Sequence, residues 1–168
     1  MRPADVEEDS EGDPADVVVR NARRKARAVP GDPVLGVDTE VYLDGRLFGK
    51  PTDQDQARAY LERLSGRTHE VFSGLVLVHE GDERSGVART KVTFRELDSS
   101  LIERYLDGDE WRNRAGGYAV QGRGAALIAS IDGDYWNVVG LPVALLLDLA
   151  PWLIDLRFSC KPRAKPGA

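Results

Sequence analysis

The sequence predicts a single α/β domain built on a mixed, twisted sheet flanked by helices. The chain has 168 residues, of which 42% are hydrophobic and 30% are charged, as in one ordinary globular domain. Helical and extended patterns are interleaved along it, and both hairpins and crossovers join the extended runs. These two kinds of connection together indicate a mixed sheet.

The first predicted helix begins at Pro14, with Asp13 as its N-cap, and runs to about Val29. On a helical wheel its alanines and valines share one face, and most of its basic side chains are arginines on the other. Lys25 is the exception, because it falls at the edge of the apolar stripe. A snorkelling lysine, whose stem covers apolar surface, is the ordinary explanation.

The most informative stretch is VLGVDTEVYLDGRLFGKP, residues 34–51. An apolar strand reaches Asp38, the chain turns at Asp44-Gly45, and it returns to Lys50 between a glycine and a proline. Asp-Gly between two apolar runs is a strong hairpin signal. Such a hairpin could hold an acid and a base together at the rim of a sheet, as a metal and a phosphate chain require. Asp38 equally fits a turn cap, and Lys50 equally fits a solvated loop lysine.

The remaining predicted elements complete the alternation of helices and strands. In chain order they are a helix between Asp53 and Gly66, strands over 70–79 and 87–94, a short helix from about residue 99, a strand over 126–131 and a helix from 143 to about 154. The last helix is apolar nearly all round, which predicts that it is mostly buried.

Composition narrows the class of protein. The net charge of −5 argues against a general nucleic-acid binder. No run approaches about 20 consecutive apolar residues, so no membrane span is expected. The single cysteine, Cys160, cannot form an internal disulfide, and a cytoplasmic location is the default expectation. Residues 159–168 form a basic, proline-bearing tail that we expect to be disordered.

Two further stretches contain groups that could bind a ligand. The acidic residues near the N-terminus, Glu8 among them, read either as a solvated end or as ligands for a hard divalent cation. The glycine-rich run 115–124 could cradle phosphate or a base with its backbone, although it lacks the Gly-Lys-Ser/Thr of a Walker A loop. Inside it, the amide of Gln121 either reads a base edge or bonds its own loop. His69 and His79 lack the spacing of a zinc site.

Taken in order, these motifs resemble the Maf family of nucleoside triphosphate pyrophosphatases. The resemblance covers nearly the whole chain and implies a Maf/ITPase-like domain over residues 1–158. The matching pieces are Glu7-Glu8, the Arg-x-Ala-x-x-Lys-Ala run that ends at Ala26, VLGVDT, GKP, LSGRTHEVFSGL, TKVTF, AGGYAVQG and VVGLP.

The resemblance implies an activity and a role for each matching residue. Family members hydrolyse nucleoside triphosphates between the α and β phosphates, limit the incorporation of modified nucleotides and influence septum formation. Asp38 would accept a proton and contact a divalent metal, Mg²⁺ or Mn²⁺, with Glu8 as a second metal ligand. Lys25 and Lys50 would neutralise phosphate charge. Homodimers are also expected.

The resemblance further suggests which base is preferred. Gln121, in Tyr-Ala-Val-Gln-Gly, resembles the dTTP/UTP branch, because the 7-methyl-GTP branch has an acid at that place. We therefore expect dTTP and UTP as substrates, with Thr39 and Gln121 as specificity positions.

The start of the printed sequence differs from the family pattern. Family members open with a strand and a Ser-x-Ser-Pro-Arg-Arg loop that grips the triphosphate, whereas this sequence starts just ahead of Glu7-Glu8. We expect either an upstream start codon or a form without this clamp. The second case motivates an alternative hypothesis, a non-catalytic protein that binds nucleotides or regulates septum formation.

Overall fold

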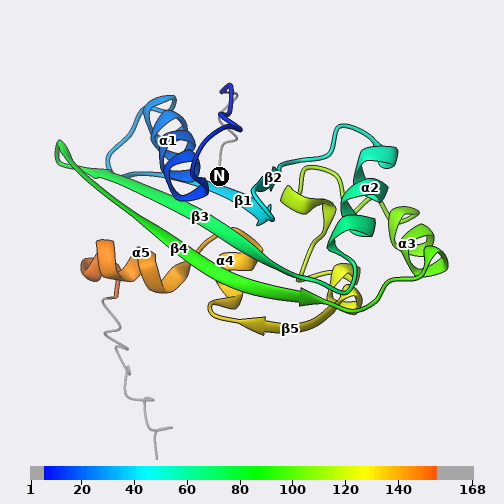
Figure 1. Ribbon diagram of the computed structural model, residues 1–168. Coiled ribbons are helices and arrows are strands. Elements are labelled where there is room, and N and C mark those ends of the chain that lie inside the picture. Colours follow the sequence, from blue (N-terminus) through cyan, green and yellow to red (C-terminus); the bar gives the residue numbers. More distant parts are fainter. Residues whose placement is uncertain (1–5, 155–168) are drawn as a thin grey trace, which may run out of the picture.

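A five-stranded sheet in the order β2-β1-β3-β4-β5 runs through the molecule, with helices on both faces and at one end (Figure 1). The computed structural model describes residues 6–154. The strands are β1 (Val34–Leu43), β2 (Arg46–Phe48), β3 (Thr68–His79), β4 (Asp82–Phe94) and β5 (Ile128–Asp132). The α-helices are α1 (Pro14–Arg27), α2 (Gln54–Leu64), α3 (Ser99–Leu106), α4 (Tyr135–Val139) and α5 (Val143–Leu149). Short 3-10 helices are η1 (Ala115–Gly117), η2 (Arg123–Leu127) and η3 (Pro151–Leu153).

The α/β prediction is confirmed, and the direction of the strands refines it. Every neighbouring pair among the described strands is antiparallel, where we expected a mixed sheet. The reason is that tight hairpins join β1 to β2 and β3 to β4. The long connection after β4 returns the chain beside the end of that strand, where Phe94 pairs with Ile128 at the start of β5. Asp44 and Gly45, at the first turn, have φ of 49° and 80°, as the predicted Asp-Gly hairpin requires.

Helix α1 lies directly on β1 and β3, because glycines remove side chains beneath it. A Cβ at Gly74 would lie 2.5 Å from the backbone carbonyl of Val18, and one at Gly36 would overlap the backbone of α1 at Ala22. The N-cap prediction is also confirmed, since the Asp13 carboxylate accepts a hydrogen bond of 2.9 Å from the Ala15 amide. Because α1 lies so close to β1, its polar side chains can contact those of β1.

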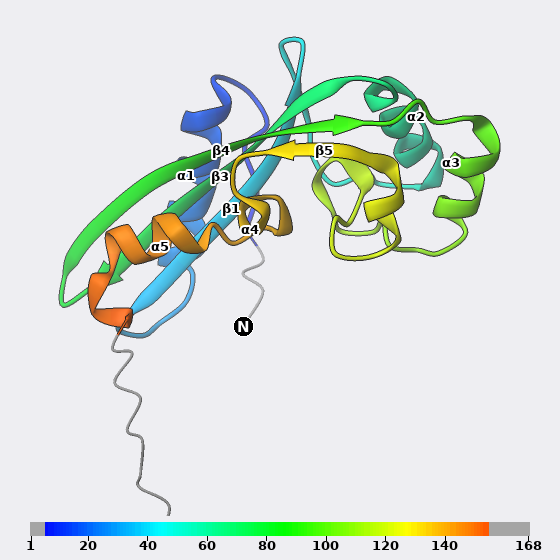
Figure 2. The same ribbon diagram turned by 90° about the horizontal axis from the view of Figure 1, so that it is seen from below.

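The opposite face of the sheet carries α4 and α5 (Figure 2). The side-chain amide of Asn137, on α4, donates to the Val71 carbonyl and to the Thr90 hydroxyl, each at 3.0 Å. The prediction that the last helix is mostly buried is wrong for α5, in which no residue is fully buried. An apolar sequence on all sides makes burial favourable, but α5 packs on β3 and β4 with one side, where Leu145 lies beside Gly86, and its residues stay partly exposed.

The larger core lies between α2, α3, the 3-10 segments and one end of the sheet. Its largest fully buried side chains include Trp111, Phe48 and Phe94. A smaller cluster of valines and alanines lies beneath α1. Packing on both sides therefore holds β1 in place, which fixes the positions of its polar side chains.

Among residues 6–154, no helix combines the length and the apolar character needed to cross a bilayer. The predicted disordered tail over 159–168 and the end of the predicted 1–158 domain lie outside the described residues.

Candidate active site

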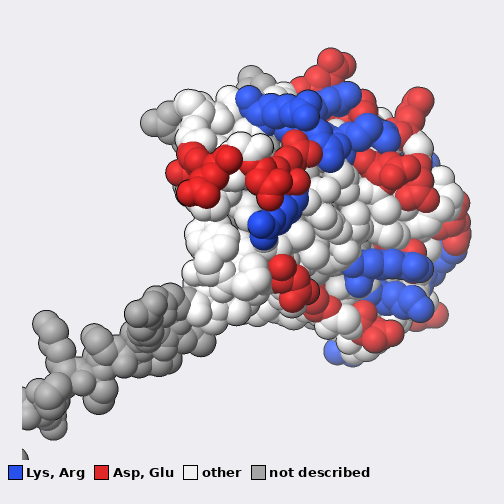
Figure 3. Space-filling view, turned by 90° about the vertical axis from the view of Figure 1, so that its left-hand side faces the viewer, with Lys and Arg blue, Asp and Glu red and all other residues white. Residues whose placement is uncertain are grey.

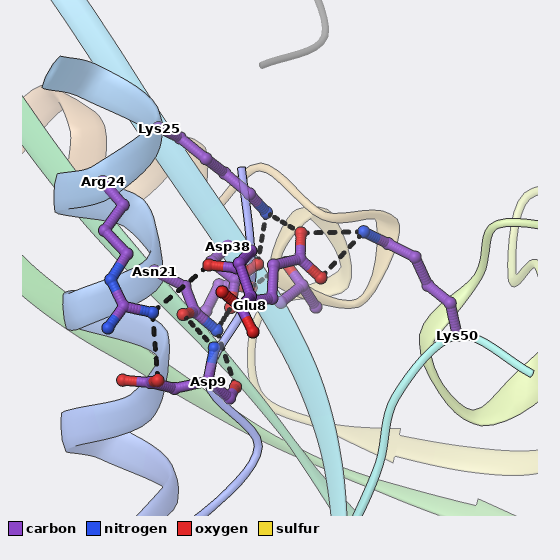
Figure 4. A network of polar contacts seen from close by, with 10 residues as sticks. Glu8, Asp9, Asn21, Arg24, Lys25, Asp38 and Lys50 are labelled. Carbon is purple, nitrogen blue, oxygen red and sulfur yellow. Dashed lines mark hydrogen bonds and ion pairs between the residues drawn. The ribbon is translucent and has the colours of Figure 1, made fainter. Parts of the chain in front are cut away.

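Asp38, on β1, is the centre of a buried polar network (Figure 4). The residue is only 4% exposed, and its side chain faces α1. One carboxylate oxygen contacts the ammonium group of Lys25, and the other accepts a hydrogen bond of 3.1 Å from the side-chain amide of Asn21. Asn21 and Lys25 are one helical turn apart, so α1 presents both side chains to the same acid.

The N-terminal segment is bound to α1 through the same asparagine. The backbone amide of Asp9 donates to the Asn21 Oδ1 at 2.8 Å, and Asn21 Nδ2 donates back to the Asp9 carbonyl at 3.0 Å. The Asp9 carboxylate in turn lies 3.0 Å from both Arg20 and Arg24. The N-terminal segment has no regular secondary structure, and these contacts anchor it to α1. They also place Glu8 next to the site (Figure 4).

Glu8 connects the two lysines. Its Oε1 lies 2.7 Å from Lys25 Nζ and 2.9 Å from Lys50 Nζ, and its Oε2 lies 3.0 Å from Lys50 Nζ. Lys50 comes from the Gly-Lys-Pro segment after β2, far from Lys25 in sequence. A single carboxylate therefore spans two ammonium groups, an arrangement that a phosphate group could also adopt.

The charges in this network stabilise one another. Burial raises the pKa of Glu8, but its hydrogen bonds to Lys25 and Lys50 outweigh burial and hold the pKa below the ordinary value. Burial lowers the pKa of Lys25, but its contacts with Asp38 and Glu8 outweigh burial and raise the pKa. Lys25 is therefore firmly charged at neutral pH.

Glu40 is a second acid that sequence reasoning missed. It lies two residues beyond Asp38 on the same face of β1 and is 7% exposed. Burial, followed by the nearby charges of Asp38 and Glu8, raises the pKa of Glu40 to about 8. Its Oε2 is buried without a hydrogen-bond partner among the described residues. The signal in the sequence was the two-residue spacing from Asp38, which puts both acids on one face of a strand.

A cleft of about 410 Å³ opens beside the network. Lys25, Asp38 and Lys50 line its polar side, and apolar residues such as Val41 and Val139 line the rest. Thr39 also reaches the cleft, although its hydroxyl lies 2.8 Å from the Ser73 hydroxyl on the other face of the sheet.

Four of the predicted site residues, Lys25, Asp38, Thr39 and Lys50, thus share this cleft, and Glu8 joins them through its lysine contacts. Gln121 is exposed and is not among the residues that line the cleft, so its role in base selection stays a prediction. Asn21 was also missed, and its signal was the four-residue spacing from Lys25 on α1.

The carboxylates of the site fit a hard divalent cation that is bound in part by oxygens of the substrate. Within residues 6–154, no three His, Cys, Asp or Glu side chains are placed to enclose a metal by themselves. Two carboxylates do converge, because Glu8 and Asp38 both contact Lys25, and Glu40 adds a buried oxygen without a partner. Mg²⁺ in phosphate-handling proteins is commonly held by one or two carboxylates together with substrate oxygens.

Outside the network, charges of both signs are interspersed. On the face shown in Figure 3, Lys and Arg side chains lie beside Asp and Glu side chains. Ion pairs on the outer side of α1 agree with this mixture, for example Arg23 with Glu83 at 2.7 Å. The charges that distinguish the cleft are therefore its convergent, partly buried lysines and acids.

A buried acid, two converging lysines and a cleft with apolar walls, all on an α/β sheet, define a site of the kind that handles phosphate esters and anhydrides. Comparison with known proteins narrows this class of site to one protein family. The family model described as "Maf-like protein" matches residues 1–151. The chain therefore belongs to the Maf family.

Relatives named dTTP/UTP pyrophosphatase are similar over most of the chain. The protein from Pyrococcus furiosus is 43% identical over 155 residues, which is 89% of this chain and 82% of that protein. The one from Pyrococcus abyssi is 40% identical over 168 residues, 97% of this chain and 87% of that protein. The one from Symbiobacterium thermophilum is 50% identical over 134 residues, 77% of this chain and 69% of that protein.

Proposed function

We propose that this protein is a nucleoside triphosphate pyrophosphatase that hydrolyses UTP and dTTP to the monophosphate and pyrophosphate. One observation carries the proposal: Lys25 and Lys50 converge on the carboxylate of Glu8 beside the buried Asp38, in a protein of the Maf family. Two converging ammonium groups suit a phosphate chain, and a neighbouring acid suits the removal of a proton from water.

Asp38 is the proton acceptor in this mechanism. Its two carboxylate oxygens are oriented by Lys25 and Asn21, so the carboxylate is held rigidly beside the cleft. Water attacks the α-phosphorus as Asp38 takes its proton, and the bond to the pyrophosphate oxygen breaks. Lys25 and Lys50 offset the negative charge that develops on the leaving pyrophosphate.

Glu8 lies between the two lysines, where a substrate phosphate would bind. A substrate phosphate would replace it as the lysines' partner, because both are oxyanions with similar demands on an ammonium group. Glu8, released from the lysines, and Asp38 are the residues that would hold Mg²⁺ or Mn²⁺. When bound, such a cation supplies positive charge to the phosphates and makes the attacking water more acidic.

The preference for uracil and thymine rests on relatives and on the cleft. Proteins named dTTP/UTP pyrophosphatase are 38–50% identical to this chain. The cleft adds apolar walls for a base and Thr39 at its edge. We assign base selection to Thr39 and Gln121.

The wider role follows the family. The protein limits the incorporation of modified nucleotides and affects cell division, as a homodimer in the cytoplasm with a divalent cation. A nucleotide-binding protein without turnover is not favoured, because the acid and both lysines are in place.

The test is to identify the products. The protein is incubated with UTP, dTTP, CTP and GTP in Mg²⁺ or Mn²⁺, and the products are separated by anion exchange. We expect UMP and dTMP with equimolar pyrophosphate, and slower turnover of CTP and GTP. Release of orthophosphate and a diphosphate, or no turnover of any nucleotide by the folded protein, would contradict the proposal. Reaction in ¹⁸O-labelled water should label UMP and leave pyrophosphate unlabelled.

A further inference from the structure

A second cavity adjoins the cleft, and Lys50 lines both. Its volume is about 660 Å³, and it lies between the N-terminal segment, the β1–β2 hairpin and α2. Two cationic side chains, Lys50 and Arg46, line it, and Glu40 forms part of its wall. The cavity therefore presents both signs of charge to a ligand.

Glu40 has a buried carboxyl oxygen, Oε2, without a hydrogen-bond partner among the described residues. Both lysines of the site hydrogen-bond to Glu8 instead. A carboxylate that is more than nine-tenths buried, with an unsatisfied oxygen, is costly to a folded protein. A ligand that binds to this oxygen would remove the cost.

At the glycine of Gly-Lys-Pro, no side chain adds to the cover of the Glu40 carboxyl group on the side of the cavity. A Cβ at Gly49 would lie 3.6 Å from Glu40 Oε2 and 3.8 Å from Oε1. Any side chain at Gly49 would therefore fill the space next to the carboxylate. Because Gly49 and Lys50 both line the cavity, the open side of Glu40 faces the same space as the lysine.

We propose that Glu40 binds a divalent cation that enters this cavity together with a pyrophosphate group, whose oxygens contact Lys50 and Arg46. A phosphate alone would leave the Glu40 carboxyl oxygen without a partner, and a cation alone would be repelled by Lys50 and Arg46. A cation–pyrophosphate pair satisfies both, and carboxylate oxygens are suitable ligands for Mg²⁺ and Mn²⁺. The inference rests on the proposed function, since it assigns the cavity to the leaving pyrophosphate of that reaction.

The test measures binding without turnover. Free Mn²⁺ is followed by electron paramagnetic resonance as it is titrated into the protein, with and without inorganic pyrophosphate. The matched control is Glu62→Gln, which removes an exposed carboxylate on α2. We expect pyrophosphate to tighten Mn²⁺ binding to the wild type and to Glu62→Gln. In Glu40→Gln the affinity measured with pyrophosphate should fall by about 10- to 100-fold.

Each outcome decides the inference. Equal Mn²⁺ affinity in Glu40→Gln and the wild type would overturn it, as would a wild type that binds no Mn²⁺ in the presence of pyrophosphate. Gly49→Ala provides a second test if Glu40→Gln does not fold, because its Cβ should also weaken binding. Nucleotide hydrolysis does not enter the readout, so a failure of this inference can be distinguished from a failure of the proposed function.

Discussion

Neighbouring residues of β1 point to opposite faces of the sheet, and the two faces differ in the kind of polar contact they hold. On the α1 side, Asp38 belongs to a network of ionised groups with Lys25 and Glu8. On the α4 side, Thr39 and Ser73 share a neutral hydrogen bond of 2.8 Å. Asn137 continues that neutral network at 3.0 Å from the Thr90 hydroxyl.

The neutral hydrogen bonds and the ion pairs serve different purposes. Neutral hydrogen bonds between buried groups attach α4 to the sheet, and they have no reason to change when a ligand binds. Ion pairs between lysines and carboxylates can exchange partners, because a phosphate offers the same charge as the carboxylate that it replaces. We therefore expect substitutions of the charged residues on the α1 face to alter activity and substitution of Asn137 on the α4 face to alter stability. Thr39, which also lines the cleft, is the exception on its face.

The largest effect is expected for Lys25→Met. This change removes a phosphate contact and the charged partner of Asp38, and kcat/KM for UTP should fall about 10²- to 10³-fold. The matched control is Lys91→Met, which removes an exposed lysine of β4. Steady-state kinetics of both variants test the prediction. Similar kcat/KM values for the two variants would show that the charged face does not drive turnover.

A pH effect on stability should follow from Glu40. Its folded pKa of about 8 exceeds the ordinary value of 4.5, so the folded protein holds a proton that the unfolded chain releases between these values. The stability that this proton provides is present below pH 4.5 and is lost as pH rises toward about 8. In metal-free buffer, the stability of Glu40→Gln relative to that of the wild type should therefore rise by about 4 kcal/mol from pH 5 to pH 9. Urea unfolding at both pH values measures this gain, and a constant difference would contradict the prediction.

Asn137→Ala tests the neutral face. It removes the side-chain donor from the Val71 carbonyl and one of two donors from the Thr90 hydroxyl, which still accepts from the Asp134 amide at 3.1 Å. The free energy of unfolding should fall by about 1–3 kcal/mol. Below the unfolding transition, kcat/KM for UTP should stay close to that of the wild type. Chemical denaturation and kinetics on the same sample check both parts. A large loss of activity with unchanged stability would remove the distinction between the faces.

The smallest effect concerns His69, which lies on the same side of the sheet as Thr39. Burial lowers its pKa from 6.5 to about 4, so the folded protein keeps it neutral while the unfolded chain binds a proton. Stability should fall by roughly 1–2 kcal/mol as pH drops from about 6.5 toward 4. His69→Phe should lose this dependence, whereas His79→Gln, at a partly exposed histidine, should retain it. Thermal unfolding across this pH range decides between them.

Much of this arrangement could be predicted because it is local in sequence. The Asp13 N-cap and the Asp44-Gly45 turn depend on a few adjacent residues, and both are confirmed. The family motifs brought Lys25, Asp38 and Lys50 to attention, and the structure places them around one cleft.

The rest could not be predicted because it depends on contacts between distant segments. Glu40 is ordinary in sequence, and it becomes exceptional only where burial leaves it without a partner. Asn21 matters because its side chain joins Asp9 to Asp38. The burial of α5 was predicted wrongly, since an apolar helix shows a preference for burial but not the presence of a partner on every side.

The most direct test of the account is to measure kcat/KM for UTP and the free energy of unfolding side by side in the wild type and in Asp38→Asn. The amide keeps the shape of the carboxylate but is a poor proton acceptor, so we predict a loss of activity of about 10²- to 10⁴-fold. The free energy of unfolding should change by less than about 2 kcal/mol, because Lys25 keeps Glu8 as a counter-ion. Activity within about tenfold of the wild type would contradict the assignment of Asp38 as the proton acceptor.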